Sequence, residues 1–164
     1  MTEVTIRDAT EADAAALLAI YNHEVMTGTA TLDLEPRTLE GQTEWIRRHQ
    51  GATPVVVAIL DDDVVGFASL SQFKERAAYR TTVENSIYVA PGMQGRGIGN
   101  LLMTEILDRA RSHGFHSVIA RIAGDNPGSI AVHMRHGYEL VGVEREVGRK
   151  FGQWLDVTEL QLLL

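Results

Sequence analysis

Three glycines, Gly95, Gly97 and Gly99, stand at alternate positions in the segment QGRGIGN, residues 94–100. The segment follows a strand-like run, SIYV, and precedes a helix-like run at residues 101–115. Glycines in such a place let successive backbone N–H groups turn toward an anion at a helix N-terminus, and a diphosphate is the natural ligand. A tight turn between a strand and a helix also needs glycine, so the glycines alone leave both interpretations open.

The spacing argues against two familiar nucleotide-binding loops. A dinucleotide fingerprint reads G-x-G-x-x-G directly after the first strand of its unit, whereas here the third glycine is misplaced and the loop follows roughly the fourth predicted strand. A Walker A loop ends in Gly-Lys-Ser/Thr, and the chain contains no such triplet. An NAD-binding protein is therefore a weak alternative, and the choice lies between another kind of diphosphate cradle and a plain turn.

A carboxylate lies shortly before this loop. Residues 82–89 alternate in polarity, which places Val83 and Ile87 on an apolar face of the predicted strand and Glu84 on the opposite, polar face. A carboxylate there is a candidate general base, and a solvated strand carboxylate is the plain alternative.

Two histidines, His133 and His136, are three residues apart in HMRH, a spacing found in metal sites. No carboxylate partner accompanies the pair, and the chain has no cysteine. We therefore expect no metal, no disulfide and no cysteine nucleophile.

The charge balance limits the class of partner. With 15 Lys and Arg against 22 Asp and Glu, the net charge of −7 opposes binding to nucleic acid along an extended surface. One local basic cluster, KERAAYR at residues 74–80, stands out within the acidic chain. It is either a solvated charge run or a site for the acidic end of a small molecule.

The length of 164 residues and the content of 45% hydrophobic and 23% charged residues are typical of one globular domain, which we expect to span residues 1–164. No segment is long and apolar enough to cross a bilayer, so we expect no membrane association. The N-terminus lacks the basic and apolar regions of a targeting signal, and we expect a cytoplasmic protein.

Apolar periodicity predicts the elements that must position these groups. Thr10 and Asp13 form a variant capping box for a helix whose buried face carries Leu17, Leu18, Tyr21 and Val25. The order is strand, helix, helix, strand, strand, strand, helix, strand, helix, strand, strand, and it predicts a layered α/β domain with mixed strand directions. The predicted segments are 3–9, a helix from Thr10, a helix ending near Gln50, 54–60, 64–70, 82–89, 101–115, 117–122, 125–137, 138–143 and 154–164.

The pattern Gln94-x-x-Gly97-x-Gly99 resembles the acetyl-CoA pyrophosphate loop of the GNAT acetyltransferases. Four blocks in order, TVENSIYV, GRGIG, IAGDNPGSIAVHMRHGY and VGRKFGQWLDV, together with IYNHEV near the N-terminus, resemble the branch that acetylates phosphinothricin and methionine sulfoximine. The resemblance covers essentially the whole chain. It implies a GNAT fold, with a mixed and mostly antiparallel sheet flanked by helices, and a homodimer to which the block VGRKFGQWLDV contributes.

The resemblance implies acetyl-CoA as co-substrate and assigns its contacts. The pantetheine arm lies against Ile87, Tyr88 and Val89, and a further contact comes from Asn126, which is also a plausible helix cap. The pyrophosphate meets the loop residues Gln94, Gly95, Arg96, Gly97, Ile98, Gly99 and Asn100.

Acetylation of an amine needs a free amine, a polarised thioester carbonyl and a proton for the departing thiolate. The resemblance makes Glu84 the general base, because the branch has its catalytic glutamate in this TVE. In many GNAT enzymes a tyrosine seven residues after this asparagine acts as the general acid that protonates the CoA thiolate. This chain has His133 at that position, and a histidine is usual there in the branch. Three roles therefore stay open for His133. It is catalytic as the general acid, it orients the thiol of CoA, or it only packs in the core.

The loop before TVE binds the acidic end of the acceptor in the resembling branch. It corresponds to Phe73, Lys74, Glu75 and Arg80, with Glu84 and Asn85 completing the acceptor site. The sulfoximine-type pattern tends to carry Trp-Arg where this chain has Phe73-Lys74, and a lysine keeps the charge but loses the bidentate fork.

The sequence thus predicts direct transfer of acetyl from acetyl-CoA to the α-amino group of phosphinothricin, methionine sulfoximine or methionine sulfone. One alternative is acetylation of a protein or peptide N-terminus, which would need an open acidic groove. Another is a CoA-binding domain without activity, which the presence of Glu84 and His133 disfavours. We expect no catalytic role for Lys150, Trp154 or Asp156.

Overall fold

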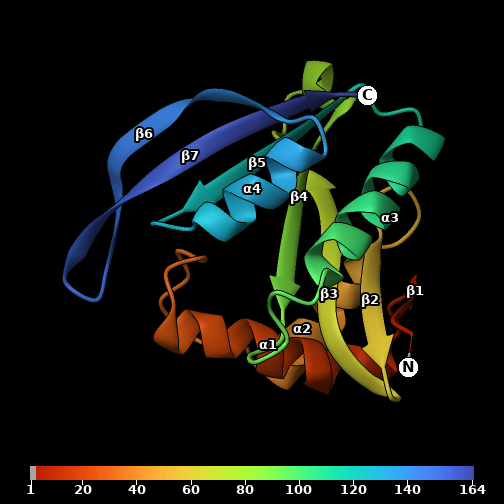
Figure 1. Cartoon of the computed structure of the whole chain (residues 1–164). Helices are drawn as coiled ribbons and strands as arrows, with labels where there is room; N and C mark the ends of the chain where they lie inside the picture. Colours follow the sequence, from red (N-terminus) through yellow and green to blue (C-terminus); the bar gives the residue numbers. More distant parts are fainter. Residues whose placement is uncertain (1–2) are drawn as a thin grey trace.

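A computed structural model describes residues 3–164 and contains one seven-stranded sheet in the order β1-β2-β3-β4-β5-β7-β6 (Figure 1). Only β4 and β5 run parallel, and the other neighbours pair antiparallel. The expected mixed, mostly antiparallel α/β fold is therefore confirmed. The strands are β1 (Thr5–Asp8), β2 (Val55–Leu60), β3 (Asp63–Gln72), β4 (Thr82–Val89), β5 (Ser117–Ala123), β6 (Glu139–Lys150) and β7 (Gln153–Leu163).

The predicted order of elements is also confirmed, with one short 3-10 turn, η1 (Glu11–Asp13), before the first helix and another, η2 (Ala77–Tyr79), before β4. The capping box forms, because the Thr10 amide donates to Asp13 Oδ2 at 2.8 Å. The helices are α1 (Ala14–Thr27), α2 (Leu39–Arg48), α3 (Ile98–Ser112) and α4 (Pro127–Arg135). Among the described residues no helix is long and apolar enough to cross a membrane.

Helices cover both faces of the sheet. On one face, α1 and α2 pack on β2 and β3 through a cluster that includes Leu17, Tyr21, Ile46 and Phe67. On the other face, α3 packs through a larger cluster of buried apolar residues that includes Leu102 and Ile106. The alternation predicted for residues 82–89 holds, because Val83 and Ile87 face the α3 side and Tyr88 faces α1.

The last two strands form a hairpin that is longer than the sequence predicts. We predicted strands at 138–143 and 154–164, whereas β6 continues to Lys150 and turns at Phe151 and Gly152, whose φ angles are 51° and 73°. Register shifts interrupt the pairing of β6 with β7, which hides the regular alternation from a reading of the sequence. The hairpin extends away from the body of the sheet (Figure 1).

The parallel pair β4 and β5 separates partway along its length. The two strands pair only from Thr82 to Glu84, opposite Ser117 to Ile119, and then diverge (Figure 1). Beyond that point β5 pairs only with β7 and β4 only with β3. The second half of β4 therefore presents one edge that no neighbouring strand covers.

Candidate active site

A cavity of about 690 Å³ opens where β4 and β5 diverge. Its walls come from the end of β4, the β4–α3 loop, the beginning of α3, one side of α4 and the end of α1. A second, smaller cavity of about 50 Å³ shares Ile87, Tyr88, Asn126 and His133 with the first and lies closer to the point of divergence. Most of the residues predicted to bind acetyl-CoA line the large cavity: residues 87–89, Gln94, Gly95, residues 97–100 and Asn126.

The glycine loop presents the N-terminus of α3 to this cavity. Gly95 and Gly97 have φ angles of 78° and 81°, which favour glycine strongly, and Gly97 is the N-cap residue of the 15-residue helix. The first N–H groups of a helix have no partner within it and carry the positive end of its dipole. The loop can therefore accept a diphosphate through backbone donors.

The side chain of Gln94 holds this loop in place through two hydrogen bonds. Its Oε1 accepts a hydrogen bond from the Gly92 amide at 2.9 Å, and its Nε2 donates to the Val89 carbonyl at 3.3 Å. The side chain thus connects the loop to the end of β4. Arg96, by contrast, is exposed and is not among the cavity-lining residues.

Asn126 caps the N-terminus of α4. Its Oδ1 accepts a hydrogen bond from the Ser129 amide at 3.1 Å, with Pro127 in the first turn of the helix. Because the same residue lines both cavities, capping and a contact with a ligand are compatible.

Glu84 stands at the last residue pair of β4 and β5 before they diverge. Burial raises the pKa of this half-buried carboxyl above its usual range, while the charge of Arg121 lowers it and that of Glu159 raises it. Two residues further along β4, Ser86 lines the smaller cavity together with Arg121. The candidate base therefore lies next to the cavity and not in its wall.

Asn85 and His133 come together on the opposite face of β4 from Glu84. The Asn85 amide nitrogen lies 3.1 Å from His133 Nε2, and both side chains are buried, each 4% exposed. Burial lowers the pKa of His133 below its usual value. His133 lines both cavities, and Asn85 lines the smaller one.

The basic segment 73–80 lies outside both cavities. It contains η2 and precedes β4, at the end of the strand away from the glycine loop (Figure 1). Lys74 Nζ lies 4.7 Å from the ring centroid of Phe73 and 5.2 Å from that of Tyr79, so its charge is held against two aromatic rings. Phe73, Lys74, Glu75 and Arg80 are brought together with the start of β4 but not with the cavity wall.

One wall of the cavity consists of residues that the sequence did not predict to be in the site. Glu24, Gly28, Thr29 and Ala30, at the end of α1 and just beyond it, all line the large cavity. The carboxylate of Glu24 accepts a hydrogen bond from the Ala30 amide at 2.9 Å and so curls over the turn. The block IYNHEV was the only signal for this region, and it did not indicate which side chains reach a ligand.

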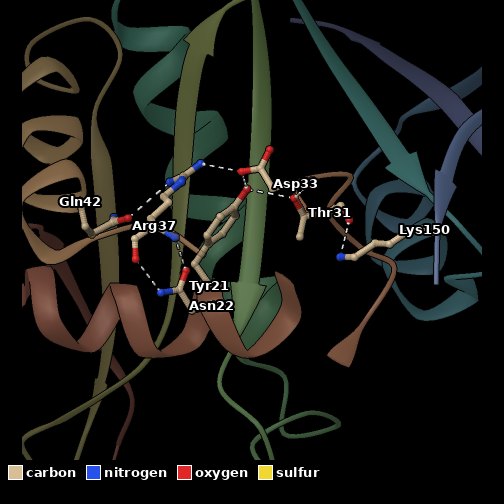
Figure 2. A network of polar contacts seen from close by, with 7 residues as sticks. All are labelled: Tyr21, Asn22, Thr31, Asp33, Arg37, Gln42 and Lys150. Atoms are coloured by element: carbon tan, nitrogen blue, oxygen red, sulfur yellow. Dashed lines mark hydrogen bonds and ion pairs between the residues drawn. The ribbon is translucent and has the colours of Figure 1, made fainter. Parts of the chain in front are cut away.

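A network of polar contacts holds the loop after α1, which contains Thr31 and Asp33, in place (Figure 2). The Tyr21 hydroxyl donates to Asp33 at 2.5 Å and lies 2.9 Å from the Thr31 hydroxyl, while Arg37 lies over the Tyr21 ring at 3.8 Å. From the β6–β7 hairpin, the ammonium of Lys150 donates to the Thr31 carbonyl at 2.9 Å and is only 2% exposed. Lys150 thus connects the hairpin to the loop that continues the cavity wall.

Within residues 3–164, no group of three or more His, Cys, Asp or Glu side chains is arranged to hold a metal ion. The His133 ring is committed to Asn85 and to the Ser129 carbonyl, and His136 lies by Thr104. Among the described residues, the groups that could bind a ligand in the large cavity are therefore backbone amides and single side chains, not a cluster of metal ligands.

Comparison with known proteins agrees with this geometry. A model of the Acetyltransferase (GNAT) family matches residues 16–138. The L-methionine sulfoximine/L-methionine sulfone acetyltransferase of Pseudomonas aeruginosa is 39% identical over 162 residues, which cover 98% of this chain and 94% of that protein.

Two solved structures are equally similar. Ribosomal-protein-alanine N-acetyltransferase from Brucella melitensis is 40% identical, with a TM-score of 0.95 over 98% of this chain and 99% of that one. A GNAT superfamily phosphinothricin acetyltransferase from Sinorhizobium meliloti, solved in complex with AcCoA, is 39% identical, with a TM-score of 0.95 over 98% of this chain and 88% of that one.

Proposed function

Since this chain belongs to the GNAT acetyltransferase family and is an acetyl-CoA-dependent N-acetyltransferase, we propose that its acceptor is the α-amino group of a small amino acid analogue. Phosphinothricin, methionine sulfoximine and methionine sulfone are the acceptors favoured by the names of relatives that align along nearly the whole chain. A protein N-terminus is the second candidate, because one relative of 40% identity is named as a ribosomal-protein-alanine N-acetyltransferase.

The observation that carries the proposal is the place of Glu84. It stands where β4 and β5 diverge, next to a cavity whose far end is the glycine loop. In the proposed arrangement the loop residues 94–100 hold the pyrophosphate, residues 87–89 with Asn126 hold the pantetheine arm, and the thioester faces the point of divergence. Glu84 then accepts a proton from the acceptor ammonium, directly or through water.

The segment 73–80 and the start of β4 are proposed to hold the acidic end of the acceptor, with Phe73, Lys74, Glu75 and Arg80 at that end, whereas Asn85 is buried on the other face of β4 against His133. Support comes from the position of this segment beside Thr82, three residues before the strands cease to pair. Two cations, Lys74 and Arg80, stand on either side of η2. Such a segment attracts an acceptor that carries a carboxylate and a phosphinate.

A panel of acceptors tests the proposal. We expect kcat/KM for phosphinothricin, methionine sulfoximine or methionine sulfone to exceed that for an alanyl peptide by about tenfold or more, a difference of about 1.4 kcal/mol in transition-state binding. Thiol release from acetyl-CoA measures each rate. Preference for the peptide would favour the second candidate, and binding of acetyl-CoA without turnover on any amine would show an inactive domain.

The charge of the acceptor allows a sharper form of this test. Lys74→Met is expected to raise KM for phosphinothricin severalfold and to leave KM for methionine sulfone nearly unchanged, because only the former carries a second anionic group. Arg48→Met, which removes a cation at the end of α2 that pairs with Glu44, is the matched control. Equal effects of Lys74→Met on both acceptors would place the phosphinate elsewhere.

We also propose a homodimer that forms through the β6–β7 hairpin. Seven large apolar side chains on this hairpin are at least half exposed, Leu140, Val141, Val143, Val147, Phe151, Trp154 and Leu163. Sedimentation of the 18.1 kDa chain is expected to give twice that mass. Val143→Asp should then yield the monomer, whereas Leu34→Asp, which changes an apolar residue of the α1–α2 loop that is at least as exposed as Val143, should not. A monomeric unmodified chain would contradict the proposal.

Residues 1–164 are proposed to act as one N-acetyltransferase domain, since relatives align over nearly the whole of the chain. The cytoplasm is the proposed location, because acetyl-CoA is supplied there. Fractionation of cells that express the chain, with activity recovered in the cytoplasmic fraction, is the expected result.

A further inference from the structure

A chain of buried hydrogen bonds crosses the molecule behind the cavity wall. The Tyr138 hydroxyl donates to Asn85 Oδ1 at 3.0 Å, Asn85 Nδ2 lies 3.1 Å from His133 Nε2, and His133 Nδ1 lies 2.7 Å from the Ser129 carbonyl. All three side chains are at most 4% exposed. This series of hydrogen bonds connects β4 and Tyr138, the residue directly before β6, to α4, one side of which lines the cavity.

These contacts determine which ring nitrogen of His133 carries the proton. A carbonyl oxygen can only accept, so Nδ1 must be the donor toward Ser129. The Tyr138 hydroxyl orients the Asn85 amide with its oxygen toward Tyr138 and its NH₂ group toward His133, so Nε2 must accept. The consistent state is a neutral imidazole with its proton on Nδ1.

The opposite orientation of the amide would require a buried cation. If Asn85 turned its oxygen toward His133, Nε2 would have to donate while Nδ1 still donated to Ser129, which makes an imidazolium. The groups that contact the ring or act on its charge are Asn85 from β4, Tyr138, and the Ser129 carbonyl and His136 from the α4 region, and none is an anion. Glu84 is on the other face of β4. Burial without a counter-ion opposes that cation.

We propose that Asn85 and Tyr138 are positioning residues that hold His133 as the neutral Nδ1–H tautomer, so that His133 fixes the first turn of α4 at the cavity wall and does not protonate the departing thiolate. This inference rests on the proposed function for its kinetic part only. Of the three roles left open for His133 by the sequence, the proposal excludes the general acid and favours the one that orients the thiol, because His133 holds the wall against which the thiol would lie.

The reaction balances without an acid from the protein. The acceptor ammonium gives one proton to Glu84, and the free amine then attacks the thioester carbonyl carbon, which forms the C–N bond. The nitrogen of the tetrahedral adduct still carries one proton more than the amide product. When the C–S bond breaks, sulfur leaves with the electron pair and takes that proton, which yields the amide and the thiol. Glu84 returns its proton to water.

Nitrogen NMR of the histidine side chains tests the tautomer, with the His133 signals identified by their loss in His133→Gln. We expect unmodified His133 to be neutral at pH 7, with the proton on Nδ1, and its pKa to lie below that of an ordinary histidine because the ring is buried. Asn85→Asp replaces the donor with an acceptor, so Nε2 should gain a proton and His133 should titrate at higher pH than in the unmodified chain. A proton on Nε2 of the unmodified chain, or titration near neutral pH, would overturn the proposal, whatever the acceptor proves to be.

Kinetics test the role. His133→Gln keeps an acceptor for Asn85 and a donor for the Ser129 carbonyl but has no titratable group, and it should retain at least about a tenth of kcat with the same pH profile. A general acid would contribute about 10²- to 10⁴-fold to kcat. A loss of kcat of that size in His133→Gln, together with disappearance of the alkaline limb of the pH profile, would contradict the proposal. Tyr138→Phe, which frees the Asn85 oxygen, should raise KM for acetyl-CoA more than it lowers kcat. His133→Leu, which keeps neither hydrogen bond, should raise that KM further.

Discussion

Glu84→Gln is expected to lower kcat/KM for acetylation at neutral pH by about 10²- to 10⁴-fold, the range of a general base. Gln keeps the shape and hydrogen-bonding capacity of the side chain but cannot take a proton from the acceptor ammonium. Thiol release at subsaturating acceptor measures the loss, and calorimetry should show that acetyl-CoA still binds. A variant that keeps kcat/KM within about threefold of the unmodified enzyme would remove Glu84 from the mechanism.

The pH profile gives an independent check on the same residue. A base must be ionised to act, so kcat/KM should rise with pH through the pKa of Glu84, and burial places that pKa above the usual range of a glutamate. Removing the charge of Glu159, which raises this pKa, should move the acidic limb to lower pH in Glu159→Gln without abolishing activity. In Glu84→Gln the limb should vanish.

Gly97→Ala is expected to raise KM for acetyl-CoA by about tenfold or more. Gly97 is the N-cap residue of α3 at a φ of 81°, a conformation in which a residue with a Cβ is disfavoured by about 1–2 kcal/mol. The loop can relieve that strain only by rotating the backbone, and the rotation turns its N–H groups away from the diphosphate. Initial rates at varied acetyl-CoA, with thermal unfolding in parallel, measure both effects.

Two other glycines separate backbone strain from ligand binding. Gly51, in the turn before β2, has a φ of 66° and lies outside the cavity, so Gly51→Ala should lower thermal stability similarly but leave KM unchanged. Gly99 does not have a positive φ, and an added Cβ would lie 3.8 Å from Val132, so Gly99→Ala should be tolerated. Equal KM values for Gly97→Ala and Gly51→Ala would contradict the assignment of the loop.

Features that depend on neighbours along the chain could be predicted from the sequence alone. Apolar periodicity and capping residues gave the order of the elements, the capping box at Thr10 and Asp13, and the polar side of β4 that carries Glu84. The glycine spacing, with its motif context, indicated a diphosphate loop, and the structure places that loop at the N-terminus of α3. Such features follow from backbone conformations and side-chain spacings that the sequence states directly.

Contacts between groups that are far apart in the chain could not be predicted from the sequence and were found in the fold. The divergence of β4 from β5 after Glu84 opens the cavity, and no local pattern announces where two strands cease to pair. Asn85 and Tyr138 are 53 residues apart, and Lys150 reaches Thr31 across 119 residues. The sequence grouped Asn85 with the acceptor site, yet the pleat turns it toward His133. Burial and hydrogen-bond partners are set by packing between distant segments, and local propensity does not encode that packing.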